Sequence, residues 1–160
     1  MIQIKLVSSW DHHMISNIYH EIRLLQSNYP NFSLWFAKVV RQLNSTTRKM
    51  YVALDEGKIA GVLILKRDNE ENKICTLRVS EHYRGRGIGS RLMNIAITEL
   101  KTNKPLITVS GAHINEFSGI LSKYGFELHQ KYKNYYCKGD YEYAFNGVLI
   151  PNSFKLSEAI

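Results

Sequence analysis

The fold is decided by one continuous stretch of the chain, Leu77-Arg78-Val79-Ser80-Glu81-His82-Tyr83-Arg84-Gly85-Arg86-Gly87-Ile88-Gly89-Ser90-Arg91-Leu92-Met93. It begins as an apolar strand, passes through a polar turn, and then carries glycine at every second position from Gly85 to Gly89. Because glycine has no Cβ, a bulky anion can approach the backbone of such a loop. The amphipathic helix that follows begins with unpaired N–H groups and the positive end of its dipole. The stretch therefore predicts a phosphate-binding loop, to which Arg84, Arg86 and Arg91 add positive charge.

Two common nucleotide-binding loops do not fit this stretch. A P-loop requires Gly-x-x-x-x-Gly-Lys-Ser/Thr, and no lysine follows Gly89. The dinucleotide fingerprint Gly-x-Gly-x-x-Gly requires a third glycine where Ser90 or Leu92 stands. The pattern that does fit is Arg84-x-x-Gly87-x-Gly89, directly after a strand. It resembles the pyrophosphate loop of the GCN5-related N-acetyltransferase (GNAT) family, Arg/Gln-x-x-Gly-x-Gly/Ala. The alternative interpretation is a glycine-rich turn without a ligand.

The hydrophobic pattern predicts an α/β fold in a single domain of residues 1–149, followed by a C-terminal tail of residues 150–160. The three strands before the glycine loop are expected to form an antiparallel meander, and the strand after its helix to lie parallel to the third of them. In order we expect a strand at 2–7, helices at 11–25 and 31–43, strands at 50–54, 59–66 and 73–79, a helix at 88–100, a strand at 106–110, a helix at 115–124, and strands at 126–136 and 141–145.

The order of these elements also resembles the GNAT family, over nearly the whole chain. A second similarity lies in Leu121–Glu127, which is similar to the family's helix–Gly-Phe junction about forty residues after the loop. The resemblance implies the GNAT acyl-CoA N-acyltransferase fold, β-α-α-β-β-β-α-β-α-β-β, with a mixed and splayed central sheet.

Composition limits the partners and the compartment. The net charge of the 160 residues is +7, which suits an anionic ligand such as coenzyme A and equally an acidic partner. The basic residues are spread along the chain, which favours a solvated surface over a nucleic-acid face. No apolar run approaches the roughly twenty residues that span a bilayer. The N-terminus alternates polar and apolar residues, as in a strand, and lacks the pattern of a signal peptide. Cys75 and Cys137 are therefore expected to be reduced thiols in a cytoplasmic protein.

The resemblance implies acetyl-CoA as the cofactor. Leu77 and Val79 would offer backbone groups to the pantetheine arm, and Asn115 resembles a cofactor-contacting asparagine at the start of the next helix. The pyrophosphate would be held by the backbone amides and arginines of Arg84, Gly85, Arg86, Gly87, Ile88, Gly89 and Ser90. We expect no metal site, because His12, His13 and His20 have no converging partner.

The proton donor for the leaving thiolate is where the sequence departs from the family. Members often have tyrosine four residues before the glycine of Gly-Phe, and Leu121 occupies that position. Tyr124 and Tyr132 are the catalytic candidates, with Tyr135 and Ser110 as further donors. The sequence does not choose among the available bases, Glu70, Glu71, His82, His113 and Glu116.

The acceptor side is less well defined. By resemblance, the segment between the first two helices forms pocket walls, which indicates Tyr29 and Trp35 together with Phe32. The aromatic C-terminal hairpin and the acidic Glu142 suit a cationic or an aromatic-bearing acceptor. Cys75 lies beside the expected thioester, and either an acetyl-cysteine intermediate or an inert buried thiol is conceivable.

These features predict an acetyl-CoA-dependent N-acetyltransferase in which a primary amine, on a small molecule or a peptide, attacks directly in a ternary complex. Two alternatives are a catalytically silent acyl-CoA-binding or interaction protein and an acetyltransferase acting on an RNA-linked amine. The strand at Tyr141–Phe145 is a candidate edge for pairing in a homodimer.

Overall fold

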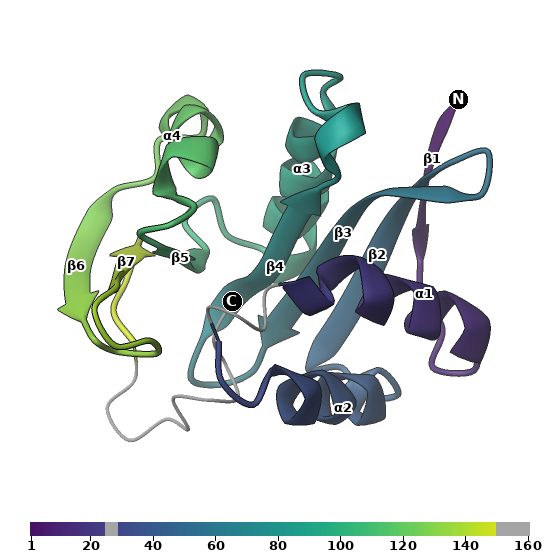
Figure 1. Cartoon of the computed structure of the whole chain (residues 1–160), viewed down its shortest axis with the longest axis horizontal. Helices are drawn as coiled ribbons and strands as arrows, with labels where there is room; N and C mark the ends of the chain where they lie inside the picture. The colour runs from purple at the N-terminus through teal and green to yellow at the C-terminus, as the bar shows by residue number, and fades with distance from the viewer. Residues whose placement is uncertain (25–28, 150–160) are drawn as a thin grey trace.

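The computed structural model describes residues 1–24 and 29–149, so the predicted tail of residues 150–160 lies outside the described residues. Within them, seven strands form one mixed sheet flanked by four α helices (Figure 1). The elements are β1 (Ile2–Leu6), α1 (His12–Ile22), α2 (Phe32–Gln42), β2 (Arg48–Asp55), β3 (Lys58–Arg67), β4 (Asn72–Val79), the short 3₁₀ turn η2 (Glu81–Tyr83), α3 (Ile88–Leu100), β5 (Leu106–Ser110), α4 (Ile114–Lys123), β6 (Leu128–Lys133) and β7 (Tyr141–Phe145).

The predicted order of helices and strands is confirmed, and the differences lie at element ends. The expected strand at 126–136 is shorter, because the Phe126 amide bonds to Leu121 O and Gly125 adopts a φ of 69°, which together close α4. Asp11 caps α1 as expected, its Oδ1 accepting from the Met14 amide at 3.0 Å. Asn31 precedes α2 but makes no side-chain capping bond, since its backbone is left-handed with a φ of 62°.

Two hydrophobic cores lie on opposite faces of the sheet. On one face, α1 and α2 bury residues such as Ile18 and Trp35 against β2 and β3. On the other face, α3 and α4 bury residues such as Leu92 and Leu121. Figure 1 shows α1 and α2 in front of the sheet and α3 behind it. Side chains of the central strands are therefore covered from both sides, except where the sheet opens.

The sheet opens between its two parallel strands. β4 and β5 pair only at Lys73↔Leu106 and Ile74↔Ile107, after which they separate (Figure 1). The separation begins at a β-bulge: Ile64 of β3 pairs with Thr76 and Leu65 with Ile74, so Cys75 is the additional residue. Because a bulge bends its strand, it turns the second half of β4 away from β5. The result is a wedge between the two halves of the sheet.

The strand order is β1-β2-β3-β4-β5-β7-β6, so β7 lies inside the sheet and β6 forms its edge. The expectation that Tyr141–Phe145 is an edge strand is therefore wrong. The hairpin returns toward β5, and the five residues of β7 fill the position between β5 and β6. No helix in the described ranges is long and apolar enough to cross a membrane.

Candidate active site

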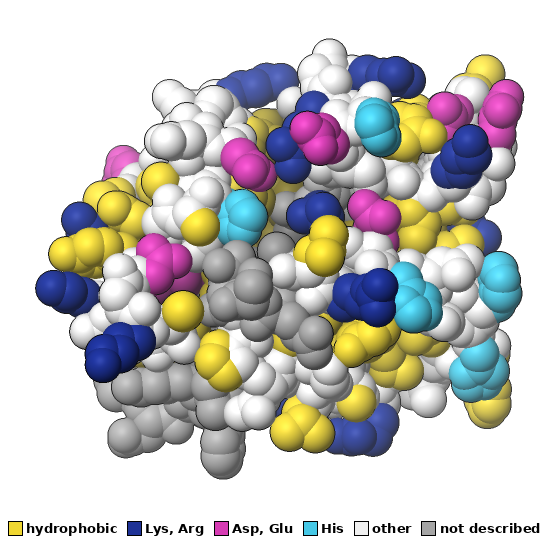
Figure 2. Space-filling model, viewed as in Figure 1, with side chains coloured by type: hydrophobic (Ala, Val, Ile, Leu, Met, Phe, Trp, Pro, Cys, Tyr) yellow, Lys and Arg dark blue, Asp and Glu magenta, His cyan; other side chains and the backbone are white. Residues whose placement is uncertain are grey.

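A cavity of about 410 Å³ occupies the wedge between β4 and β5. Its walls come from the second half of β4, the glycine loop with the start of α3, β5, one face of α4, and Tyr29 from the segment before α2. Figure 2 shows this side of the molecule hollowed near its centre, with basic, acidic and histidine side chains around the hollow. The cavity thus joins the glycine loop to the interior of the sheet.

The glycine loop has the backbone expected of an anion site. Gly85 and Gly87 have φ angles of 76° and 78°, in the left-handed region that favours glycine. Gly87 is the N-cap of α3, and the Arg91 amide donates to Gly87 O at 3.1 Å. The amides of residues 88–90 therefore precede the hydrogen-bonded part of the helix and are available to a ligand.

Arg84 connects the loop to the neighbouring elements. Its Nε donates to Val79 O at 3.3 Å, and its Nη2 lies 3.4 Å from Glu116 Oε2 on α4. His113 Nδ1 lies 3.5 Å from the other oxygen of Glu116. Val79, Arg84, His113 and Glu116 all line the cavity, and the half-exposed guanidinium of Arg84 lies at its open side.

The inner end of the cavity is unusually polar for a buried region. The hydroxyls of Thr76, Thr108 and Ser110 are buried there, and none makes a hydrogen bond of standard geometry in the described part of the chain, although Thr108 lies close enough to Glu142, and Ser110 to Tyr29, to affect their ionisation. The Tyr29 hydroxyl donates to Glu142, with its oxygen 3.1 Å from Oε1 and 3.4 Å from Oε2. Since polar groups buried without partners are costly, this end of the cavity is suited to a polar ligand.

The two residues of this hydrogen bond have shifted ionisation. Burial raises the pKa of Glu142 to about 7, although the Tyr29 hydroxyl, Thr108 and Lys73 act in the opposite direction. Burial also raises the pKa of Tyr29 well above its usual range, and the charge of Glu142 raises it further. The Tyr29 hydroxyl therefore keeps its proton at neutral pH and can donate it in a hydrogen bond, while the Glu142 carboxyl is partly protonated and partly ionised at that pH.

A family model described as "Acetyltransferase (GNAT) domain" matches residues 31–135, which contain the glycine loop and most of the cavity. The chain belongs to the GNAT acetyltransferase family. A search of curated protein sequences found no match. The family resemblance seen in the sequence is thereby confirmed.

Solved structures show the same fold at low sequence identity. A GNAT-family protein from Desulfovibrio desulfuricans has a TM-score of 0.71 at 12% identity, covering 91% of this chain and 97% of that chain. The ribosomal-protein-S18-alanine N-acetyltransferase from Escherichia coli has a TM-score of 0.68 at 16% identity, covering 96% and 99%. Arabidopsis thaliana NAA60, solved with acetyl-CoA, has a TM-score of 0.67 at 20% identity, covering 91% and 97%. The predicted GNAT fold is confirmed.

Most of the residues expected to hold the cofactor of a GNAT protein lie together. The cavity is lined by Leu77, Val79, Arg84, Gly85, Gly87, Ile88, Gly89 and Ser90. Two of the expected residues are not among those that line it. Arg86 stacks over the Tyr83 ring with its guanidinium carbon 5.2 Å from the ring centroid. Asn115, in the first turn of α4, accepts a hydrogen bond from Ser118 Oγ on its backbone oxygen.

The two tyrosines expected to be catalytic point elsewhere. The Tyr124 hydroxyl donates to Ser90 O at 3.0 Å and lies 2.8 Å from Asn94 Oδ1, so it fastens α4 to α3. The Tyr132 hydroxyl accepts from the Leu149 amide at 3.1 Å. Neither is among the described residues that line the cavity, and their catalytic role stays a prediction.

The remaining candidates divide in the same way. Of the two expected pocket walls, Tyr29 lines the cavity, whereas Trp35 is 1% exposed and packs in the first core against Phe32. Of the candidate bases, His113 and Glu116 line the cavity, while Glu70, Glu71 and His82 are not among its walls. Cys75 is fully buried and accepts from Arg48 Nη1 at 3.2 Å.

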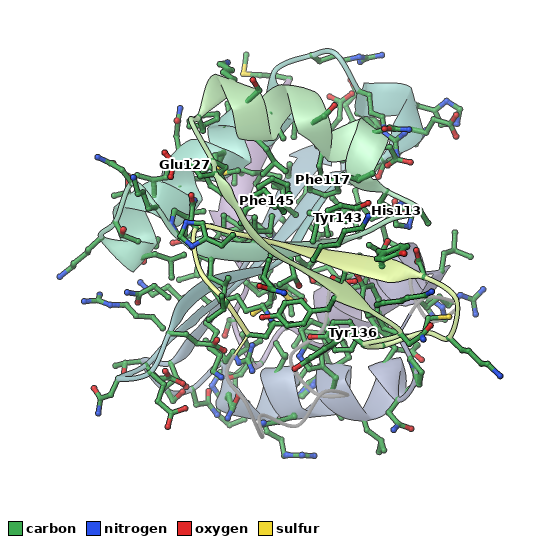
Figure 3. The ribbon with its side chains drawn as sticks, turned by 90° about the vertical axis from the view of Figure 1, so that its left-hand side faces the viewer. His113, Phe117, Glu127, Tyr136, Tyr143 and Phe145 are labelled. Atoms are coloured by element: carbon green, nitrogen blue, oxygen red, sulfur yellow. The ribbon has the colours of Figure 1, made fainter. Side chains whose placement is uncertain are left out.

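Glu142 is a buried residue at the inner end of the cavity, and the sequence did not predict its burial. The sequence marks it only as an acidic group suited to a cationic acceptor. A signal is present in the alternation of Tyr141–Phe145: Glu142 and Ala144 are buried, and the aromatic residues between and around them are half-buried. A carboxylate at a buried strand position is rare unless it is paired, and Glu142 is paired with the Tyr29 hydroxyl. Figure 3 shows Tyr143, Phe117 and His113 on the α4 side of β7 and Tyr136 on the other side.

Proposed function

We propose that this GNAT protein is an acetyl-CoA-dependent N-acetyltransferase that transfers the acetyl group to a primary amine by direct attack in a ternary complex. The observation that carries the proposal is the cavity itself. It extends from a glycine loop with an anion-binding backbone to a buried polar end between the two separated strands. A thioester cofactor bound by its pyrophosphate at the loop would reach that end.

The cofactor would be held mainly by backbone groups. The residues of β4 beyond Ile74 have no partner on β5, so the amides and carbonyls of Leu77 and Val79 can pair with the pantetheine arm as a further strand would. The amides of residues 88–90 would bind the pyrophosphate, and Arg84 would add charge at the mouth. Arg86 and Asn115 would contact the cofactor from outside the cavity walls.

The chemistry requires a neutral amine, a polarised carbonyl and a proton for the thiolate. Backbone N–H groups of β4 near residues 77–79 are suited to polarise the thioester oxygen. A thiolate is a fair leaving group, so the reaction can proceed with leucine at position 121, where members of the family often have tyrosine. Tyr124 and Tyr132 remain the predicted donors; Tyr124 would have to release the hydrogen bond it donates to Ser90 O, whereas Tyr132 only accepts a bond and keeps its own proton.

Two of the structural relatives support this proposal. NAA60 was solved in complex with acetyl-CoA, and the Escherichia coli protein is an N-acetyltransferase that acts on an alanine. Both share the fold of this chain at 20% identity or less. They support acetyl-CoA as the cofactor and nitrogen as the acceptor atom.

The test has two steps. Isothermal titration calorimetry with acetyl-CoA measures binding, and release of free thiol with a broad panel of amines, followed by mass spectrometry of the products, measures transfer. We expect saturable binding and at least one acetylated amine. Binding without any product would instead support the silent acyl-CoA-binding alternative. Acetylation of an aminoacylated tRNA, together with tRNA binding that weakens with salt, would support the RNA-linked alternative.

A further inference from the structure

We propose that Tyr29 and Glu142 form a proton relay at the inner end of the cavity, in which the Tyr29 hydroxyl contacts the acceptor ammonium and Glu142 receives its proton. This inference rests on the proposed N-acetyltransferase function and deepens it. It assigns the base to Glu142 of β7, acting through Tyr29 of the segment before α2. Neither residue is among the five candidate bases named from the sequence.

The geometry supplies a connected path. Tyr29 lines the cavity, and Glu142 lies behind it, 3% exposed and within hydrogen-bond distance of the Tyr29 hydroxyl. Glu142 is paired in register with Ser110 of β5, which also lines the cavity. A ligand at this end therefore meets the hydroxyls of Tyr29 and Ser110 first. A proton can reach the carboxylate through the Tyr29 oxygen, which has a free lone pair when its own proton is directed at Glu142.

The groups around Glu142 leave it able to accept a proton. Lys73 of β4 is the nearby cation, and Asp140 in the turn before β7 is the nearby anion. The neutral neighbours are Thr108 of β5, Tyr29, and Tyr132, which is its register partner on β6. Burial outweighs these interactions and raises the pKa of Glu142 to about 7, which is where a general base is most effective at neutral pH.

The relay accounts for every proton of the transfer. An ammonium ion gives one proton to the Tyr29 oxygen while the Tyr29 proton passes to Glu142, leaving a neutral amine and a carboxylic acid. The amine lone pair then forms the N–C bond to the thioester carbonyl, and the C–S bond breaks. The departing thiolate takes a proton from a tyrosine hydroxyl, the second amine proton passes to that tyrosine, and the products are an amide and free coenzyme A. Glu142 returns its proton to solvent after the products leave.

The experiment uses a matched pair of small amines. Ethylamine is an ammonium ion at neutral pH, whereas trifluoroethylamine is neutral there because its fluorines withdraw electrons. Thiol release is followed for both amines across the pH range in the full-length wild type, Tyr29→Phe and Glu142→Gln. For ethylamine, wild-type kcat/KM should level off above about pH 7, where Glu142 is ionised. In both variants it should keep rising toward the pKa of ethylamine, and at pH 7 it should be lower by about 100-fold.

Trifluoroethylamine separates the relay from a structural role, because it needs no base to become neutral. With it the three proteins should agree within a few fold at pH 7. Tyr143→Phe and Glu127→Gln are the matched controls: each makes the same chemical change outside the cavity walls and should keep the wild-type profile with ethylamine.

Each other result counts against a stated claim. If both variants keep the wild-type plateau near pH 7 with ethylamine, or lose equal activity with both amines, the relay is excluded and the N-acetyltransferase function stands. If wild type binds acetyl-CoA but releases no thiol with either of these amines or with any amine of the broad panel, the amine-acetylating function fails and the relay with it. If acetyl-CoA does not bind, the cofactor assignment fails first.

Discussion

The Tyr29 hydroxyl donates to Glu142 Oε1 at 3.1 Å, joining residues that are 113 positions apart in the chain. Tyr29 belongs to the segment that leads into α2, which packs against the half of the sheet containing β2 and β3. Glu142 belongs to the other half, where β5, β7 and β6 lie. The bond therefore crosses the wedge opened by the separation of β4 from β5, at the end where the polar side chains gather.

A buried carboxyl of this kind should cost stability at high pH. The folded pKa of Glu142 is about 7, against an ordinary 4.5, so between these values the folded state binds more protons than the unfolded state. Stability therefore falls as the pH rises from about 4.5 to about 7. Replacing Glu142 by glutamine removes this dependence, and the variant should gain on wild type by about 3 kcal/mol across that range. Denaturant unfolding at a series of pH values measures the difference, and parallel stability curves for the two proteins would contradict it.

The glycine loop could be predicted from local patterns, because its strand, loop and helix follow one another directly in the chain. Glycine is also the residue that most readily adopts the positive φ angles found at Gly85 and Gly87. The pairing of Tyr29 with Glu142 is different. Alternation shows that Glu142 shares a face with Ala144, but which layer covers that face depends on how distant segments pack. The edge of the sheet was mispredicted for the same reason: a hairpin pattern defines two paired strands and does not say which of them meets β5.

The glycine loop can be tested with a charge placed on its backbone. In Gly87→Glu a carboxylate stands where the cofactor pyrophosphate is expected, and the side chain is also strained at a φ of 78°. Acetyl-CoA binding measured by calorimetry should be lost while the protein stays folded. Gly57→Glu is the matched control, since Gly57 has a φ of 81° in the β2–β3 hairpin, outside the cavity walls. Equal binding by the two variants would contradict the loop assignment.

An acetyl-cysteine intermediate can be excluded or established at Cys75. The thiol is fully buried, accepts from Arg48 Nη1 and is not among the residues that line the cavity, so we expect no covalent role. Cys75→Ala should keep wild-type thiol release and lose about 1 kcal/mol of stability through the small cavity it creates. Intact-protein mass spectrometry after incubation with acetyl-CoA should show no added acetyl group in wild type. An acetylated wild type beside an unmodified and inactive Cys75→Ala would establish the covalent route.

The position of the family's usual tyrosine offers a final test. Leu121 is 2% exposed and packs in the second core, while Glu116, Phe117 and Ile120 of the same helix line the cavity. A tyrosine at this position would have to fit a larger side chain and a hydroxyl into an apolar core. Leu121→Tyr should therefore lose about 1–3 kcal/mol of stability without any gain in the rate of acetyl transfer.

Leu121→Met is the matched control for that substitution, because it keeps the volume nearly constant and should cost less than about 1.5 kcal/mol. Thermal unfolding gives the stabilities, and single-turnover thiol release gives the chemical step apart from product release. A faster chemical step in Leu121→Tyr would show that the side chain at this position reaches the thiolate after all. An unchanged step would mean that a tyrosine at position 121 does not reach the thiolate, which leaves Tyr124 and Tyr132 as the predicted donors.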